Sequence, residues 1–107
     1  MEETPNPASP ERIIDHSEVI EALKAKGPDD PEVKQLVIKW TEQQESIIAE
    51  DFKANSRIIF ELRRSEIYIA AGDPEYALEC LQDALTQAVG EGEVELEQET
   101  RKKMFQL

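Results

Sequence analysis

The sequence has few of the residues that form disulfides, metal sites or catalytic sites. Its 107 residues include one cysteine, Cys80, and one histidine, His16. A single cysteine cannot form an internal disulfide, and these two residues cannot supply the three or four ligands of a typical zinc site. No nucleophile lies beside a base in a recognisable arrangement, and the spacing of a calcium loop is absent. We therefore expect a non-catalytic protein that uses no metal and no cofactor.

Long apolar runs and excess positive charge are also missing. No stretch reaches the roughly 18 apolar residues of a transmembrane helix, and the first residues, MEETPNPASP, do not resemble a secretion signal. Lys and Arg number 12 against 24 Asp and Glu, which gives a net charge of −12. Because nucleic acids and anionic membranes are bound through positive charge, neither is an expected partner. The sequence predicts a cytoplasmic protein that favours basic partners, and the simpler role of the charge is solubility.

The remaining composition is sufficient for one small helical domain. Hydrophobic residues make up 39% of the chain and charged residues 34%, which provides a core for one domain but not for two. Residues 1–10 contain three prolines and no apolar periodicity, so they are expected to form a flexible lead. Residues 11–107 are predicted to form a single all-α domain of about four or five helices, arranged as antiparallel hairpins.

The first predicted hairpin is defined by its capping residues. Its first helix begins at Asp15, with Glu18 as the second half of a capping box, and ends before Gly27. Its second helix begins at Asp30, which is followed by a proline and a glutamate. His16 lies in the first turn of the first helix and is expected to be exposed.

The middle of the chain contains either one very long helix or two helices. No glycine or proline occurs in residues 32–71. A break at Asn55 and Ser56 is preferred, because a single helix would exceed the usual globular length. The segment 58–71 has apolar side chains on two nearly opposite faces, which predicts a central helix packed between two neighbours. Three charged side chains are assigned to the flanks between these faces: Glu61, Arg63 and Arg64.

Two further helices are predicted after the central one. Gly72 ends the central helix and Asp73 caps the next, whose single apolar stripe predicts an outer helix on one neighbour. Cys80 flanks this stripe and is predicted to be a small core residue. A charged terminal helix is expected over about residues 93–107. Two pairs of opposite charge at i, i+4 support it: Glu97 with Arg101, and Glu99 with Lys103.

Small and large side chains follow a fixed pattern from residue 58 to about residue 91. Six positions carry it: Ser65, Tyr68, Gly72, Ala77, Leu81 and Ala84. In this register the segment resembles one tetratricopeptide repeat, a helix–turn–helix unit of about 34 residues. The chain departs from the family at its Trp, Leu and closing Pro positions, which fall on Glu61, Arg64 and Val89. The resemblance implies a tetratricopeptide-like hairpin over residues 57–90, and the alternative is an unrelated helical bundle.

The resemblance also implies a binding face on the central helix. In the family, ligand peptides contact first-helix side chains, which here are Ile59, Leu62, Glu66, Ile69 and Ala70. This mostly apolar face with one acid is suited to an amphipathic helix or an apolar peptide that carries a basic residue. Clamping of a terminal carboxylate is not expected, because Leu62 and Glu66 replace the lysine and asparagine used for it. The alternative is that the preceding helix covers this face.

Two functions are compatible with these features. The first is a protein–protein interaction module, an adaptor or scaffold that binds a basic or amphipathic protein or peptide. The second is a structural bundle that self-assembles as a homodimer without an exchangeable ligand. A stable dimer that hides Ile59, Leu62 and Ile69 would favour the second function, whereas a monomer that exposes them would favour the first.

Overall fold

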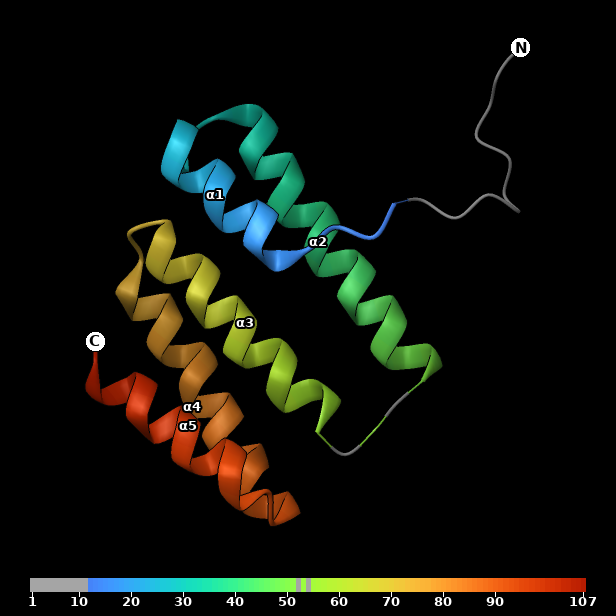
Figure 1. The fold of residues 1–107 in the computed structure, drawn as a ribbon, viewed down its shortest axis with the longest axis vertical. Coiled ribbons are helices and arrows are strands. Elements are labelled where there is room, and N and C mark those ends of the chain that lie inside the picture. The colour runs from blue at the N-terminus through green and yellow to red at the C-terminus, as the bar shows by residue number, and fades with distance from the viewer. Residues whose placement is uncertain (1–11, 52, 54) are drawn as a thin grey trace.

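The computed structural model describes residues 12–51, 53 and 55–107, so the expected flexible lead, residues 1–10, lies outside the described residues. Figure 1 shows two antiparallel hairpins, followed by a last helix that lies against the second hairpin. No strand occurs among the described residues. The predicted all-α fold of antiparallel hairpins is therefore confirmed. The helices are α1 (His16–Lys26), α2 (Pro31–Glu50), α3 (Ser56–Ala70), α4 (Pro74–Glu91) and α5 (Val94–Phe105).

Aspartates cap two of the helices as the sequence predicts. The Asp30 carboxylate accepts hydrogen bonds from the backbone N–H groups of Glu32 at 2.9 Å and Val33 at 3.1 Å. The Asp73 carboxylate accepts one from the backbone N–H of Tyr76 at 3.1 Å. These bonds satisfy donors that the first turn of a helix leaves without an internal partner. They confirm the predicted starts of α2 and α4.

The start of α1 differs from the prediction. The Asp15 side chain forms no cap hydrogen bond and instead accepts one from the Ser17 hydroxyl at 2.9 Å. The Glu18 carboxylate pairs with the Arg12 guanidinium at 2.7 Å. The predicted capping box is therefore wrong, because a nearby hydroxyl and a nearby cation engage the two carboxylates that would have formed it.

These two kinds of helix start predict different responses to alanine. Asp30→Ala should lower the free energy of unfolding by about 1 kcal/mol, since it removes a cap that accepts two backbone hydrogen bonds. Asp15→Ala serves as the matched control and should change it by less than about 0.5 kcal/mol. Urea denaturation of both variants checks this. Equal losses would show that the Asp30 cap contributes no more than an exposed aspartate does.

The break between α2 and α3 lies where it was predicted. Helix α2 ends at Glu50 and α3 begins at Ser56, with Asn55 in the N-cap position. The Ser56 hydroxyl accepts a hydrogen bond from the backbone N–H of Lys53 at 3.2 Å. The chain therefore turns back here, and α3 runs beside the helices that precede it (Figure 1).

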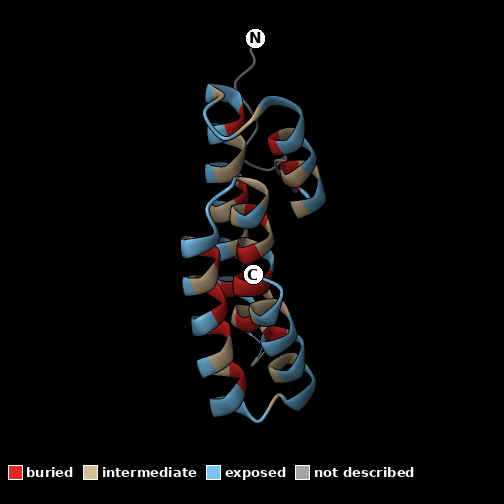
Figure 2. Ribbon diagram, turned by 90° about the vertical axis from the view of Figure 1, so that its left-hand side faces the viewer, coloured by how far each residue is buried: buried red, intermediate tan, exposed pale blue. Residues whose placement is uncertain are grey.

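Two apolar clusters lie on opposite sides of α3. Phe60 and Ile67 belong to the cluster shared with α1 and α2, and Ile58 and Leu62 belong to the cluster shared with α4 and α5. Figure 2 shows buried positions on the sides where the helices face one another, with exposed positions outside. Because α3 packs against all four other helices, its prediction as the central helix is confirmed.

Helix α4 has two neighbours, so the prediction of an outer helix on one neighbour is wrong. Its alanines Ala77, Ala84 and Ala88 are fully buried, which allows close approach of the adjacent helices. Its core side chains pack with Leu62 of α3 and also with Leu96 of α5. A single apolar stripe is therefore wide enough to contact two helices at once. Cys80 is buried, as predicted.

Candidate functional site

The predicted binding face of α3 does not form one open floor. Leu62 is only 4% exposed and belongs to the cluster with α4 and α5. Ile59 is half-buried, and Ala70 packs against the cluster on the other side of α3. Among these five residues Ile69 is the exposed one, at 46%. Leu62 is covered by α4 and α5, and Glu66 is contacted by α1 and α5. The preceding helix, α2, contributes to the cluster against which Ala70 packs.

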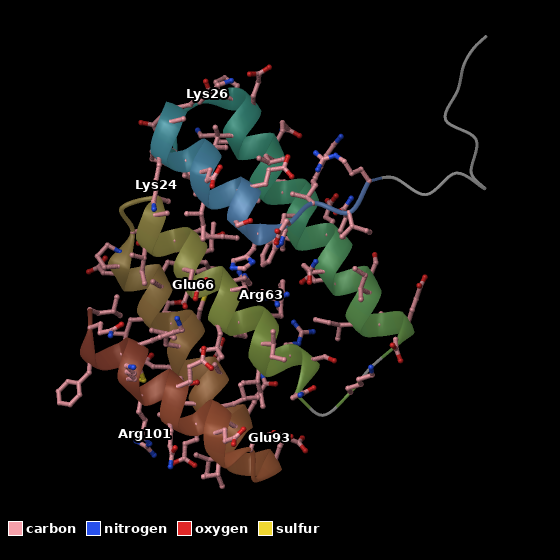
Figure 3. The ribbon with its side chains drawn as sticks, in the orientation of Figure 1. Lys24, Lys26, Arg63, Glu66, Glu93 and Arg101 are labelled. Carbon is pink, nitrogen blue, oxygen red and sulfur yellow. The ribbon has the colours of Figure 1, made fainter. Side chains whose placement is uncertain are left out.

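Glu66 joins three helices at the centre of this face. Its Oε2 accepts a hydrogen bond from Lys103 Nζ of α5 at 2.7 Å, and its Oε1 lies 3.1 Å from His16 Nε2 of α1. Figure 3 labels Glu66 on the middle of α3. The expectation of an exposed His16 is therefore wrong, and Lys103 contacts Glu66 where a pair with Glu99 was predicted. The carboxylate expected to meet a basic residue of a ligand meets a basic residue of the chain itself.

A hollow remains beside Glu66, between α1, α3 and α5. Charged groups of both signs border it, so it is not the mostly apolar groove that the sequence predicted. Its lining residues are His16, Ile59, Leu62, Arg63, Glu66, Leu96 and Glu99.

An apolar groove lies on the other side of α3, between the α1–α2 hairpin and the C-terminal half of α3. It encloses about 280 Å³. Ile38 lies at its edge and is 47% exposed. The lining is apolar apart from the Lys34 ammonium and the Tyr68 hydroxyl. The lining residues are Leu23, Pro28, Lys34, Val37, Ile38, Ile67, Tyr68 and Ala71.

The α2 wall of this groove was missed in the sequence. Val37 and Ile38 are adjacent in the sequence, and both line the groove. Two adjacent apolar residues subtend about 100° on a helix, so one of them must point away from the centre of a narrow stripe. The run Leu36, Val37, Ile38 was the available signal.

Aromatic contacts fix the position of the groove walls. The rings of Trp40 on α2 and Phe60 on α3 stack with centroids 5.6 Å apart. Tyr68, which lines the groove, meets the ring of Tyr76 on α4 edge to face at 4.4 Å. Such aromatic pairs add to the stability that burial already provides. Of these two pairs, the buried Trp40–Phe60 stack joins α2 and α3, the helices that supply opposite walls of the groove.

Arg64 lies among these rings and pairs with a buried acid. Its guanidinium is 5.3 Å from the ring centroid of Phe60, 5.5 Å from that of Tyr76 and 6.0 Å from that of Tyr68. It donates to the Tyr76 hydroxyl at 2.7 Å and to Glu61 at 3.1 Å. Glu61 is only 5% exposed, and this burial raises the pKa of its carboxyl. The assignment of Glu61 and Arg64 to solvated flanks was wrong, because aromatic side chains and α4 cover that side of α3.

Cys80 lies close to this pair and is not placed for nucleophilic chemistry. Its side chain is buried, and burial raises the pKa of the Cys80 thiol to about 11. The reactive form of cysteine is the thiolate, which this environment disfavours at neutral pH. The thiol therefore contributes to packing rather than to a reactive centre.

Comparison with known proteins adds no assignment. No family model matches the chain. No curated protein and no solved structure shows a significant match either. None of the described helices combines the length and the apolar character needed to cross a membrane. The functional argument therefore rests on the geometry of the described residues.

Proposed function

We propose that the protein is a non-catalytic protein–protein interaction module that binds its partner in the apolar groove between the α1–α2 hairpin and α3. The groove itself carries this proposal. It is a concave apolar surface of about 280 Å³ with Ile38, 47% exposed, at its edge. Contact between water and such an apolar surface is unfavourable. Burying the surface against an apolar partner therefore stabilises the complex.

The proposed scaffold of this module is a tetratricopeptide-like hairpin made by α3 and α4. Its support is local packing: Ser65, Ala77 and Ala84 are fully buried at positions where the repeat requires small side chains. Gly72 has a φ of +80° at the turn between the helices, a conformation that glycine adopts without steric strain. In this proposal the hairpin supplies the α3 wall, and α1 and α2 supply the opposite wall.

The proposed partner is an amphipathic segment with a net positive charge. The chain has a net charge of −12, so its field attracts cationic segments. Exposed acids adjoin the groove in sequence, because Asp29 follows Pro28 and Asp73 lies two residues beyond Ala71. An apolar helical face would fill the groove while lysines or arginines on its borders face these acids. Lys34 on the groove wall provides a contact for a single acid of the partner.

The probe for this proposal is a helical peptide of leucine and lysine, with the leucines on one face. Isothermal titration should detect binding to the wild-type protein that weakens as salt is added. Ile38→Lys should weaken binding by about tenfold or more, which corresponds to about 1.4 kcal/mol, because it sets a charge at the edge of the apolar groove. Ile38 is partly exposed, so the variant should keep its cooperative thermal melt.

The matched control is Val89→Lys on α4, which adds the same charge at a position that is 53% exposed. Its affinity for the peptide should stay within about twofold of the wild type, less than 0.5 kcal/mol. Equal losses in the two variants would show that the peptide senses only net charge. Unchanged binding to Ile38→Lys would show that the groove is not the site.

A self-assembling bundle is the second candidate, and one surface feature favours it. Phe105 of α5 is 95% exposed and borders a hollow that also contains Leu85 and Met104. An exposed aromatic beside an apolar hollow is typical of a protein contact. Sedimentation equilibrium of the wild-type chain separates the two candidates. A tight dimer that fails to bind the peptide favours the bundle, whereas a chain that binds the peptide, as a monomer or as a dimer, favours the module.

A further inference from the structure

Helix α5 packs against the α3–α4 hairpin in the way that a separate helical ligand would bind to it. It supplies one narrow face, on which Leu96, Thr100 and Met104 recur at i, i+4 and i+8. Thr100 is fully buried, and the other two pack against the cluster formed by α3 and α4. The rest of α5 is strongly polar, and both Val94 and Phe105 are exposed. The attachment of α5 therefore depends on few side chains.

A charge contact fixes the position of α5 on this face. Lys103 Nζ donates to Glu66 Oε2 at 2.7 Å, with side-chain exposures of 23% and 33%. An amphipathic helix that carries a basic residue opposite Glu66 is the ligand that the sequence predicts for this face. Helix α5 matches that description. The chain thus carries both a helix-binding face and a helix that fits it.

A short turn is the covalent link between α5 and its docking face. Gly92 has a φ of +72°, and the backbone N–H of Glu93 donates to the carbonyl of Ala88 at 2.9 Å. Among the described elements, α5 packs only against α3 and α4. Glu93, the other residue of the turn, has a ψ of 81°. If Gly92 and Glu93 both took up helical angles, α4 would continue into α5 as one helix, and α5 would leave its own docking face.

We propose that α5 is an exchangeable arm, and that two copies of the chain form a dimer by docking α5 of each copy on the α3–α4 face of the other. The helix on the α3–α4 face then has the same sequence in the monomer and in the dimer. Every side-chain contact of α5 is therefore kept, including that of Lys103 with Glu66. Only the two-residue turn of Gly92 and Glu93 changes, which makes exchange of an identical element a low-cost route to a dimer. This inference concerns a different face from the apolar groove and does not depend on the proposed function.

A charge-exchange experiment tests the proposal directly. Chains with Glu66→Lys and chains with Lys103→Glu each place two like charges between α3 and α5. In a swapped dimer of one chain of each kind, the introduced lysine meets the introduced glutamate, and the native Lys103 meets the native Glu66. Both contacts are restored in that dimer, whereas neither variant can restore them alone.

The two variants are mixed in equal amounts, one of them labelled with ¹⁵N, unfolded in denaturant and refolded together at high concentration. Native mass spectrometry should then show mixed dimers well above the statistical share, which a mixture of labelled and unlabelled wild type defines. A mixture that contains only monomers, or that pairs no better than the wild type does, overturns the proposal.

The hinge provides an independent test. Gly92→Ala should lower the dimer dissociation constant by about tenfold or more, because a left-handed conformation is unfavourable for alanine and the dimer relieves it at two hinges. Gly27→Ala is the control: its φ is +88°, and neither added Cβ meets another atom within 4 Å. Gly27→Ala should lower the free energy of unfolding without lowering the dimer dissociation constant. Equal dimerisation of the two variants, measured by sedimentation equilibrium, would contradict a hinge at Gly92.

Discussion

Leu62→Lys is expected to abolish the cooperative thermal melt of the protein. Leu62 is 4% exposed and packs with Leu81 and Ala84, so the variant would bury an unpaired ammonium group in the core. A loss of about 4 kcal/mol or more is in the exceptional range for a single substitution. It is comparable to the whole stability of a small domain, about 5 kcal/mol at the low end.

Circular dichroism provides the measurement, and Ile69→Lys on the same helix provides the control. Ile69 is 46% exposed, so this variant should unfold cooperatively near the wild-type temperature. A folded Leu62→Lys variant would mean that α4 and α5 do not cover the face, and the open groove predicted from the sequence would then be correct.

Arg64→Met is expected to lower the free energy of unfolding by about 3 kcal/mol at neutral pH. Methionine keeps much of the apolar stem but removes the guanidinium from Tyr76 and from Glu61. The Glu61 carboxylate would then be buried without its cation. Urea denaturation should show this loss, which is larger than that expected for a surface residue.

The loss should also depend on pH in a defined direction. Burial raises the pKa of Glu61, and the positive charge of Arg64 opposes that increase. A carboxyl with a raised pKa in the folded state contributes stability at low pH that is lost as pH rises through this pKa. Removing Arg64 raises the pKa of Glu61 further, so the deficit of Arg64→Met should be larger at pH 7.5 than at pH 5.

The double variant Glu61→Gln with Arg64→Met isolates this effect. It has no buried carboxyl to titrate at this position, so its deficit relative to Glu61→Gln alone should be nearly independent of pH between the two conditions. If the deficit of Arg64→Met is the same at pH 5 and pH 7.5, the Glu61 carboxyl is not desolvated beside Arg64 as described.

Local signals in the sequence predicted most helix boundaries. Asp30 and Asp73 cap helices because a carboxylate, a proline and an acid follow one another in the right order, and this chemistry needs no tertiary structure. The same logic gave a wrong capping box at Asp15, where Ser17 and Arg12 engage the carboxylates. Local sequence therefore predicts a helix cap correctly only where no other hydrogen-bond donor lies close to the capping carboxylate.

The site was harder to predict, because periodicity defines the faces of one helix but not which helix covers each face. Leu62 was expected on a binding face or beneath the preceding helix, and its cover is α4 and α5. Lys103 has an acid four residues before it but contacts Glu66, 37 positions away in sequence. The apolar groove depends on how α2 is positioned against α3, which no local pattern in α2 specifies. Buried Glu61 was missed because charged residues are usually exposed.

The most direct test of the interaction module is to observe which methyl groups of the protein contact a bound peptide. Val37 and Ile38 line the groove, and Val89 lies on α4, outside it. The protein is prepared with ¹³C-labelled methyl groups and mixed with saturating unlabelled leucine–lysine peptide, and filtered NOE spectra are recorded. Contacts from peptide leucines to Val37 and Ile38, with none to Val89, are expected. Contacts confined to Val89, or no contacts at saturation, would contradict binding in the groove.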